Sequence, residues 1–320
     1  MSATKANFHF HLSSNHLKMF SKLTVKFFSN SLRFNHSAVA AAFSPNNVGP
    51  QNQYKVDSKK KEKLQLNENF RMEMAKPEDT NRILSFMEKN YFCNNALSSS
   101  LYLCYRKLDD TMEFYIKELL SQGITMIARE NSMENGIVGI CINQKSCKWD
   151  GDRLDALAKA ANNVNTRKLL HIWGLLAREP SLHDNLSQQT IFDLRLISVK
   201  KSPHGHGLAM ELAKRSLCLG RDLNFNFARL DATDEFEKRI AKEFDMEQLW
   251  SVNYKNIVGD DGHSPVAIPE LPNTNAGVYY VNLKTMDDKR ICDMKMRGPL
   301  VEKMRWRVWA IHSKRQLALV

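Results

Sequence analysis

Hydrophobic and polar residues along the middle of the chain switch between strand-like and helix-like patterns. Residues 191–199 form an apolar, β-branched run, which predicts a buried strand. Pro203 cannot continue the hydrogen-bond ladder of a strand, and Gly205 and Gly207 permit a turn with positive φ. From Leu208 the apolar positions take the spacing of a helix. The pattern therefore predicts a strand, a glycine turn and a helix in succession.

Further strands and helices are predicted on both sides of this unit. Asn135-Gly136 predicts a hairpin turn between the second and third of the strands. Alternating apolar positions predict strands at residues 70–74, 124–129, 137–143, 225–230 and 277–283. Helical spacing predicts helices near residues 83–87, 112–120, 154–170, 172–176 and 208–220.

A helix that begins directly after a strand and a glycine turn is suited to binding an anion. The first backbone N–H groups of such a helix lack partners inside it, and the helix dipole favours negative charge there. A helix that simply starts after a tight turn fits the same spacing equally well. No Gly-Lys-Ser/Thr follows, which excludes a P-loop, and the third glycine of the dinucleotide-binding fingerprint is missing.

His204, Gly207 and Ala209, which follow a strand ending in Leu-x-Ser-Val, resemble the Arg/Gln-x-x-Gly-x-Gly/Ala signature of the GNAT acetyltransferases. The surrounding segments narrow the resemblance to insect-type arylalkylamine (dopamine-like) N-acetyltransferases, and it spans residues 64–283. It implies the GNAT acyl-CoA N-acyltransferase fold, a mixed and mostly antiparallel sheet flanked by helices, with a splayed central pair of strands. The family's small-Thr/Ser segment, short helix and Tyr-containing strand are matched by residues 231–233, 237–246 and 252–254.

The same resemblance implies transfer of an acetyl group from acetyl-CoA to a small amine such as dopamine, serotonin or tryptamine. The cofactor arm would lie between the splayed strands, and a backbone N–H near Ser198 or Val199 would hold the thioester carbonyl. Backbone N–H groups from Gly205 to Ala209 would hold the pyrophosphate, while His204 replaces the usual Arg or Gln. The implied cofactor-binding residues are Ile197, Ser198, Val199, His204, Gly205, His206, Gly207, Leu208 and Ala209.

Three residues take positions that matter for catalysis in the family. Alignment of the loop after Phe92 places Asn95 where the family has a glutamate general base, and an asparagine cannot accept a proton at neutral pH. Thr233 stands where the family has a Ser/Thr near the cofactor thiol, and Glu237 follows four residues later. We expect Glu237 to be an exposed acid in the first turn of a helix; a compensating base at that position is the alternative.

These departures from the family pattern leave other functions open. A relative that binds CoA without efficient turnover is one alternative, and an acetyltransferase of polyamine or protein amines is another. If turnover occurs, the proton of the amine must leave through Glu237, a water chain or bulk solvent. Trp149 and Trp173 could line a pocket for an aromatic amine, although aromatic residues at such spacing more often belong to a core.

The net charge of +11 is concentrated at the two ends of the chain. Residues 1–64 carry ten Lys/Arg and two Asp/Glu, and residues 286–320 carry nine and four, so the middle of the chain is slightly acidic. This distribution argues against a folded nucleic-acid-binding face. We expect a basic, disordered extension over 1–64, an acetyltransferase domain over 65–285 and a basic C-terminal extension over 286–320.

Compartment and partners are indicated only by composition. No acidic residue precedes Asp57, as in a mitochondrial presequence, but a disordered extension of a cytoplasmic protein is the favoured interpretation. No apolar run is long enough to span a bilayer. The six cysteines lack metal-type spacing, so we expect reduced thiols, and the scattered histidines predict no metal site. We expect a monomer that binds acetyl-CoA and a small amine.

Overall fold

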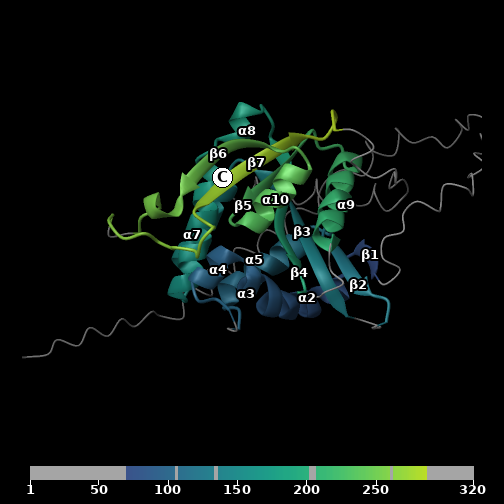
Figure 1. Cartoon of the computed structure of the whole chain (residues 1–320), viewed down its shortest axis with the longest axis horizontal. Coiled ribbons are helices and arrows are strands. Elements are labelled where there is room, and N and C mark those ends of the chain that lie inside the picture. The colour runs from purple at the N-terminus through teal and green to yellow at the C-terminus, as the bar shows by residue number, and fades with distance from the viewer. Residues whose placement is uncertain (1–69, 105–106, 133–135, 202–206, 260–261, 287–320) are drawn as a thin grey trace, which may run out of the picture. The chain divides into compact units, whose positions relative to one another are not determined.

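One sheet of seven strands organises the part of the chain that the computed structural model describes, residues 70–104, 107–132, 136–201, 207–259 and 262–286. The strands are β1 (Phe70–Met74), β2 (Met126–Glu130), β3 (Ile137–Cys147), β4 (Thr190–Val199), β5 (Phe227–Ala232), β6 (Glu247–Asn253) and β7 (Asn275–Asn282). Their order across the sheet is β1-β2-β3-β4-β5-β7-β6 (Figure 1). Neighbouring strands are antiparallel except β4 and β5, which are parallel. The mixed, mostly antiparallel sheet predicted from the sequence is confirmed.

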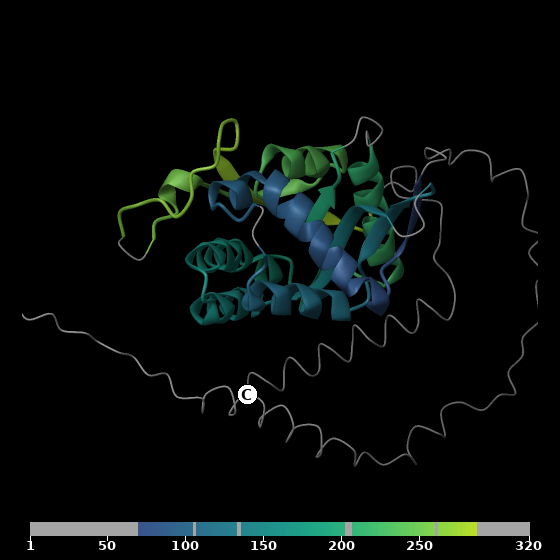
Figure 2. The same cartoon turned by 90° about the horizontal axis from the view of Figure 1, so that it is seen from below.

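Helices cover both faces of this sheet. Figure 2 shows α9 and α10 on one side of the strands and α6 and α7 on the other. The helical segments are η3 (Pro77–Asp79), α2 (Thr80–Phe86), η4 (Met87–Tyr91), α3 (Phe92–Asn94), α4 (Ala96–Ser100), α5 (Asp110–Ser121), α6 (Asp150–Ala160), α7 (Val164–Arg178), α8 (Leu182–Asn185), α9 (Leu208–Asp222), α10 (Glu235–Glu243) and η5 (Tyr254–Asn256).

Side chains of β4 contribute to two separate hydrophobic cores. Ile191 and Leu196 belong to the core that also contains α5 and α7, whereas Phe192, Leu194 and Ile197 belong to the core that contains α9. Successive side chains of a strand point to opposite faces of a sheet, so a strand that is apolar at nearly every position needs helices on both faces. This explains why the run at 191–199 could be recognised as a buried strand.

The strands β4 and β5 separate soon after they begin. Their backbones pair at only two positions, the last of which joins Asp193 and Arg229. Opposite β3, the register shifts so that Arg195 has no partner residue across from it. Such a bulge bends a strand and increases its local twist, which accounts for the divergence of β4 from β5 beyond this point. The predicted splayed pair of strands is confirmed.

Buried charges bridge the two strands just where the backbone pairing stops. The Arg195 guanidinium lies 3.0 Å from the Asp231 carboxylate and 4.7 Å from the centre of the Trp173 ring. Arg229 lies 2.5 Å from the other oxygen of Asp231. The Gln144 side chain donates a 2.7 Å hydrogen bond to Asp193. The ion pair of Arg195 with Asp231 therefore joins the diverging strands where their ladder has ended, and Arg229 and Gln144 hold the carboxylates on either side of it.

Two segments differ from their predicted secondary structure. The helices expected at 154–170 and 172–176 are instead α6 and α7, because the chain is extended at Ala161. Asn163 then caps α7 by accepting hydrogen bonds from the backbone N–H groups of Asn165 and Thr166. Tyr254, which the resemblance placed in a strand, begins the short helix η5.

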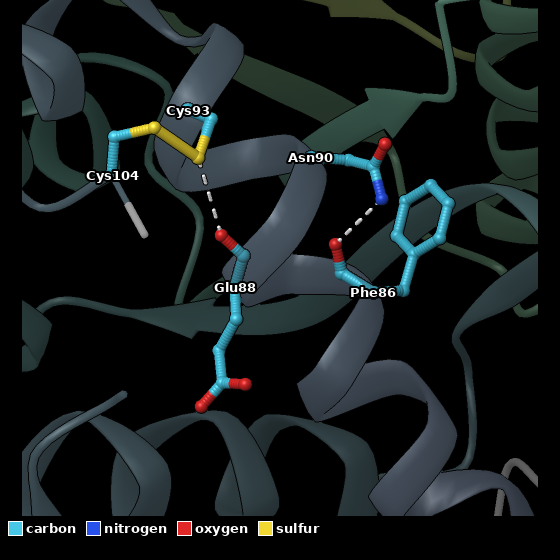
Figure 3. Close-up of a disulfide and its surroundings, with 5 residues drawn as sticks. All are labelled: Phe86, Glu88, Asn90, Cys93 and Cys104. Atoms are coloured by element: carbon cyan, nitrogen blue, oxygen red, sulfur yellow. Dashed lines mark hydrogen bonds between the residues drawn. A yellow bond between two sulfur atoms is a disulfide. The ribbon is translucent and has the colours of Figure 1, made fainter. Parts of the chain in front are cut away.

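Cys93 and Cys104 form a disulfide, so the expectation of reduced thiols is wrong for this pair (Figure 3). Cys93 lies within α3, and the chain turns through α4 before Cys104, which brings their Cα atoms to 4.3 Å. The Cys93 sulfur also lies 3.5 Å from the Glu88 carbonyl oxygen. Cys141, Cys147 and Cys218 are buried free thiols. A spacing of eleven residues carries no sequence signal for a disulfide, because the turn that closes it is set by tertiary packing.

The predicted extensions over 1–64 and 286–320 lie outside the described residues, with the exception of Met286. In the part of the chain that is described, no helix combines the length and apolarity needed to cross a bilayer. Nor do three His, Cys, Asp or Glu side chains of these residues gather where they could hold a metal ion.

Candidate active site

A cavity of about 250 Å³ occupies the opening between β4 and β5. Residues from both sides of the sheet line it: Tyr91 belongs to the core that contains α5 and α7, whereas Phe236 packs against the core that contains α9. Molecules could therefore meet in the opening from opposite faces of the sheet. The lining residues are Tyr91, Asn94, Asn95, Ile197, Ser198, Val199, Lys201, Asp234, Phe236, Glu237 and Arg239.

The open edge of β4 presents backbone N–H groups to this cavity. The N–H of Lys200 donates a 2.8 Å hydrogen bond to the carbonyl of Val138, and Ser198 pairs with Ile140 of β3. Alternate residues of a strand direct their backbone groups to opposite edges, so the N–H groups of Ile197 and Val199 point away from β3. Of the two positions predicted to hold a carbonyl, Val199 therefore has the suitable orientation, and the N–H of Ser198 is directed to β3.

Asn95 is buried and holds the loop between α3 and α4 against the end of β5. Its side-chain nitrogen lies 2.8 Å from the Thr233 hydroxyl oxygen and 3.1 Å from the Asp234 carboxylate. Its side-chain oxygen accepts hydrogen bonds from the backbone N–H and the hydroxyl of Ser98, which caps α4. An amide is suited to this position because it donates and accepts at once, which a carboxylate cannot do.

Glu237 is only 3% exposed, so the favoured expectation of an exposed helical acid is wrong. Its carboxylate accepts a 2.6 Å hydrogen bond from the Thr233 backbone N–H and a 2.7 Å bond from the Thr233 hydroxyl. Asp234 caps α10 by accepting from the Glu237 backbone N–H at 3.0 Å. This cap directs the first turn of α10 back over Thr233, and the Glu237 side chain consequently lines the cavity. Asn95, Thr233 and Glu237, three residues singled out in the sequence, thus form one hydrogen-bonded chain.

Burial controls the electrostatics of this chain of residues. Burial, and next the charge of Asp234, raises the pKa of Glu237 well above its usual range. Burial also raises the pKa of Asp234, although the backbone N–H groups of Glu237 and Ala96 oppose the shift. A buried carboxyl group with a raised pKa is a stronger proton acceptor once it ionises, which is the property that a general base requires. The arrangement is therefore capable of removing a proton from a molecule in the cavity.

Two further residues support the site and were missed in the sequence. The Tyr254 hydroxyl donates a 2.6 Å hydrogen bond to the Thr233 carbonyl and fixes the end of β5. Asp234, three residues before Glu237, fits the helix-start pattern of a cap followed by a glutamate, so a closer inspection of spacing could have found it. Tyr254 offers no such signal because its contact depends on how η5, which follows β6, lies against the end of β5.

Comparison with solved structures identifies the architecture, although no family model and no curated protein matches the sequence. A mosquito arylalkylamine N-acetyltransferase like 5b superposes with a TM-score of 0.61 at 15% identity, covering 67% of this chain and 99% of that one. Arylalkylamine N-acetyltransferase 2 from Aedes aegypti gives 0.61 at 18% identity with the same coverage. The polyamine N-acetyltransferase of Drosophila melanogaster gives 0.58 at 13%, covering 67% of this chain and all of that one.

The chain has the GNAT acetyltransferase fold. Identities this low establish the fold and leave substrate and activity to the site itself. The glycine turn, which the resemblance expects to hold the pyrophosphate, lies between β4 and α9. His204, Gly205 and His206 fall outside the described residues.

The described end of this glycine turn is compatible with anion binding. Gly207 has φ +89°, a conformation that favours glycine, and a Cβ built there would meet no described atom within 4 Å. Leu208 and Ala209 begin α9 and are buried against the sheet, so their side chains anchor the helix, whose first N–H groups have no partner within it. Neither Trp149 nor Trp173 lines the cavity, and Trp173 packs in the core beside Arg195.

Proposed function

We propose that this protein is an acetyl-CoA-dependent N-acetyltransferase that acts on a small amine. The observation that carries the proposal is the buried carboxylate of Glu237 in the cavity between two strands that have stopped pairing. An opening between parallel strands offers unpaired backbone groups to an extended ligand, and a carboxylate beside it offers a proton acceptor. Together they suit a site that brings acetyl-CoA and an amine into contact and takes up the amine proton.

The residues present fit acetyl-CoA. The N–H groups of Ile197 and Val199 face the opening and would hold amide or carbonyl oxygens of the cofactor arm. No described atom lies within 4 Å of where a Cβ of Gly207 would stand, so the backbone before the first turn of α9 could approach the diphosphate closely. When bound, acetyl-CoA supplies an acetyl group activated as a thioester. The N–H of Val199 would stabilise the negative charge that develops on the acetyl oxygen.

The role of Glu237 follows from the protonation state of the substrate. A small alkylamine has a pKa of about 10, comparable to lysine, and its nitrogen must lose a proton before it can form a bond to carbon. In the proposed reaction a C–N bond forms and the C–S bond breaks. The protonated amine loses two protons: the first passes to Glu237 directly or through water, and the second, released once the C–N bond has formed, is taken up by the departing thiolate, so that CoA leaves as its thiol. Thr233 and Asn95 are positioning residues, because they hold the carboxylate and the loop that faces it.

The aromatic side chains of the cavity favour an arylalkylamine over a polyamine. Tyr91 and Phe236 offer aromatic surface on the two sides of the opening, against which an aryl group could pack. The charges of the lining favour neither class of amine, because the exposed Lys201 and Arg239 are balanced by the carboxyl groups of Asp234 and Glu237. A CoA-binding relative without turnover remains the alternative that Asn95 and His204 motivate.

Titration with acetyl-CoA, followed by thiol release in the presence of dopamine, tryptamine or spermidine, tests the proposal. We expect saturable binding and release with an aryl amine. Binding without release would favour the inactive relative, and release with spermidine alone would refute the aryl assignment. Gly207→Glu should abolish cofactor binding because it places a negative charge in the diphosphate site, whereas Gly207→Ala should retain it in part; unchanged affinity in Gly207→Glu would contradict the site.

A further inference from the structure

A second concavity, a groove of about 570 Å³, lies where β4 leaves the sheet. Three cationic side chains line it: Arg82 of α2, Lys89 of η4 and Lys200, which directly follows β4. The amide of Asn81 and the hydroxyl of Ser85 add polar groups, and none of its described lining residues is a carboxylate. The groove is therefore suited to an anion with several oxygen acceptors.

The cations stand on one surface because of helical periodicity. Arg82 and Lys89 are seven residues apart, which places them on the same side of a helix about 10 Å apart along its axis. Asp79 lies 3.5 Å from Arg82, but the same oxygen is 2.6 Å from Arg129, and Asp79 is buried. Asp79 is thus held toward Arg129, which it shares with Glu73, and lies farther from Arg82. The Glu88 carboxylate accepts the backbone N–H of Leu108 and so is held toward the start of α5.

The groove adjoins the candidate active site along both of its walls. Lys200 is followed by Lys201, which lines the cavity, and Asn90 of the groove is followed by Tyr91, which lines the cavity as well. A ligand that leaves the cavity at the carboxyl end of β4 therefore leaves it beside Lys200, and the groove continues from there to Arg82 and Lys89. The proposed cofactor leaves the cavity at this end, because its diphosphate would bind at the start of α9.

We infer that this groove binds a phosphate monoester, namely the 3′-phosphate of coenzyme A. The assignment rests on the proposed function, since it requires that acetyl-CoA occupies the opening between β4 and β5. A phosphate monoester carries close to two negative charges and three acceptor oxygens, and Arg82, Lys89 and Lys200 supply matching donors. In the glycine turn, His204 stands where the family signature has Arg or Gln. The groove would thereby supply, from outside the turn, the positive charge that an arginine supplies within it.

Calorimetric titration of the full-length protein with CoA and with dephospho-CoA, which lacks only the 3′-phosphate, tests this inference. The wild type should bind CoA more tightly than dephospho-CoA by about tenfold, a typical value for one or two charge-assisted contacts. The double variant Arg82→Ala/Lys89→Ala should lose this preference by binding CoA more weakly while its affinity for dephospho-CoA stays unchanged. Both residues are exposed, and circular dichroism will confirm that the variant is folded.

Lys168→Ala is the matched control, because it removes one exposed cation from α7, away from the groove. It should leave the preference for CoA intact. Equal affinity of the wild type for both ligands would overturn the groove assignment while leaving the proposed function standing. An equal loss of both affinities in the double variant would indicate a general field effect and would also overturn it. If the wild type bound neither ligand, the proposed function itself would fail.

Discussion

The side-chain nitrogen of Asn95 lies 2.8 Å from the hydroxyl oxygen of Thr233, although 138 residues separate them in the chain. This contact joins the loop between α3 and α4 to the end of β5. The Thr233 hydroxyl has one hydrogen, which it donates to Glu237. Its oxygen therefore accepts the hydrogen bond from the Asn95 amide. The direction of every bond in this buried chain is thereby fixed, and Glu237 is held as an acceptor.

Glu237→Gln tests the proposed base. It should lower the rate of acetyl transfer by about 10²- to 10⁴-fold, the usual contribution of general base catalysis, without changing the affinity for acetyl-CoA. Burial raises the pKa of Glu237, so the rate of the wild type should rise with pH above the usual range of a glutamate. The Gln variant should lack this rise in its pH–rate profile. Glu235→Gln, on the same helix, is the control and should keep the wild-type profile.

Asn95→Asp separates the donor role of Asn95 from its role as a cap. The new carboxylate can still accept from Ser98, but it cannot donate to Thr233 or Asp234. It also places a negative charge beside Asp234. We expect the free energy of unfolding at neutral pH to fall by about 1–3 kcal/mol and to recover in part as the pH is lowered. Denaturant titrations can measure this, and Asn94→Asp, an exposed neighbour, should show no comparable loss.

Asp193 should make the stability of the protein depend on pH. Burial raises its pKa to about 6, against 3.8 for an ordinary aspartate. The native state therefore retains a proton that the unfolded chain has released, and stability decreases as the pH rises through this interval. We expect a decrease of about 2–3 kcal/mol between pH 4 and pH 7 that Asp193→Asn removes. If Asp193→Asn showed the same slope as the exposed control Asp152→Asn, another group would be responsible.

Reduction of the Cys93–Cys104 disulfide should loosen the loop that carries Asn95. The bond closes a short loop, with a separation of eleven residues, and a loop of this size stabilises a protein by about 2–3 kcal/mol. Dithiothreitol should therefore lower the midpoint of thermal unfolding and reduce acetyl transfer. Cys93→Ser/Cys104→Ser should start at the lower midpoint and respond little to the reductant. Insensitivity of the wild type would show that the pair is reduced in solution.

Much of the sheet could be predicted because the apolar pattern within each strand is enough to identify it. The apolar run at 191–199 corresponds to β4, and the strand expected at 70–74 matches β1. The bulge at Arg195 could not be predicted, because a strand that is apolar on both faces shows no alternation for an extra residue to interrupt. The divergence of β4 from β5 was expected only through the family resemblance.

The residues of the candidate site could be predicted, but their contacts with one another and their burial could not. Asn95, Thr233 and Glu237 were singled out separately, and no local pattern shows that they touch. The burial of Glu237 depends on the Asp234 cap and on a loop far away in sequence, so the local preference of an acid for an exposed first turn gave the wrong expectation. Roles in catalysis and in cofactor binding remain predictions for these residues.

The extra residue in β4, Arg195, decides whether this strand diverges from β5 or pairs with it throughout. The side chains of Leu194 and Ile197 already face one core and that of Leu196 faces the other, so a chain without Arg195 would keep its remaining neighbours on their present faces. Nothing in the hydrophobic pattern would then oppose a straight strand hydrogen-bonded to β5 along its whole length. Deletion of this single residue could thus give a well-packed protein whose sheet has no opening for a ligand. An active site of this kind depends on one inserted residue in a strand as much as on its acidic and amide side chains.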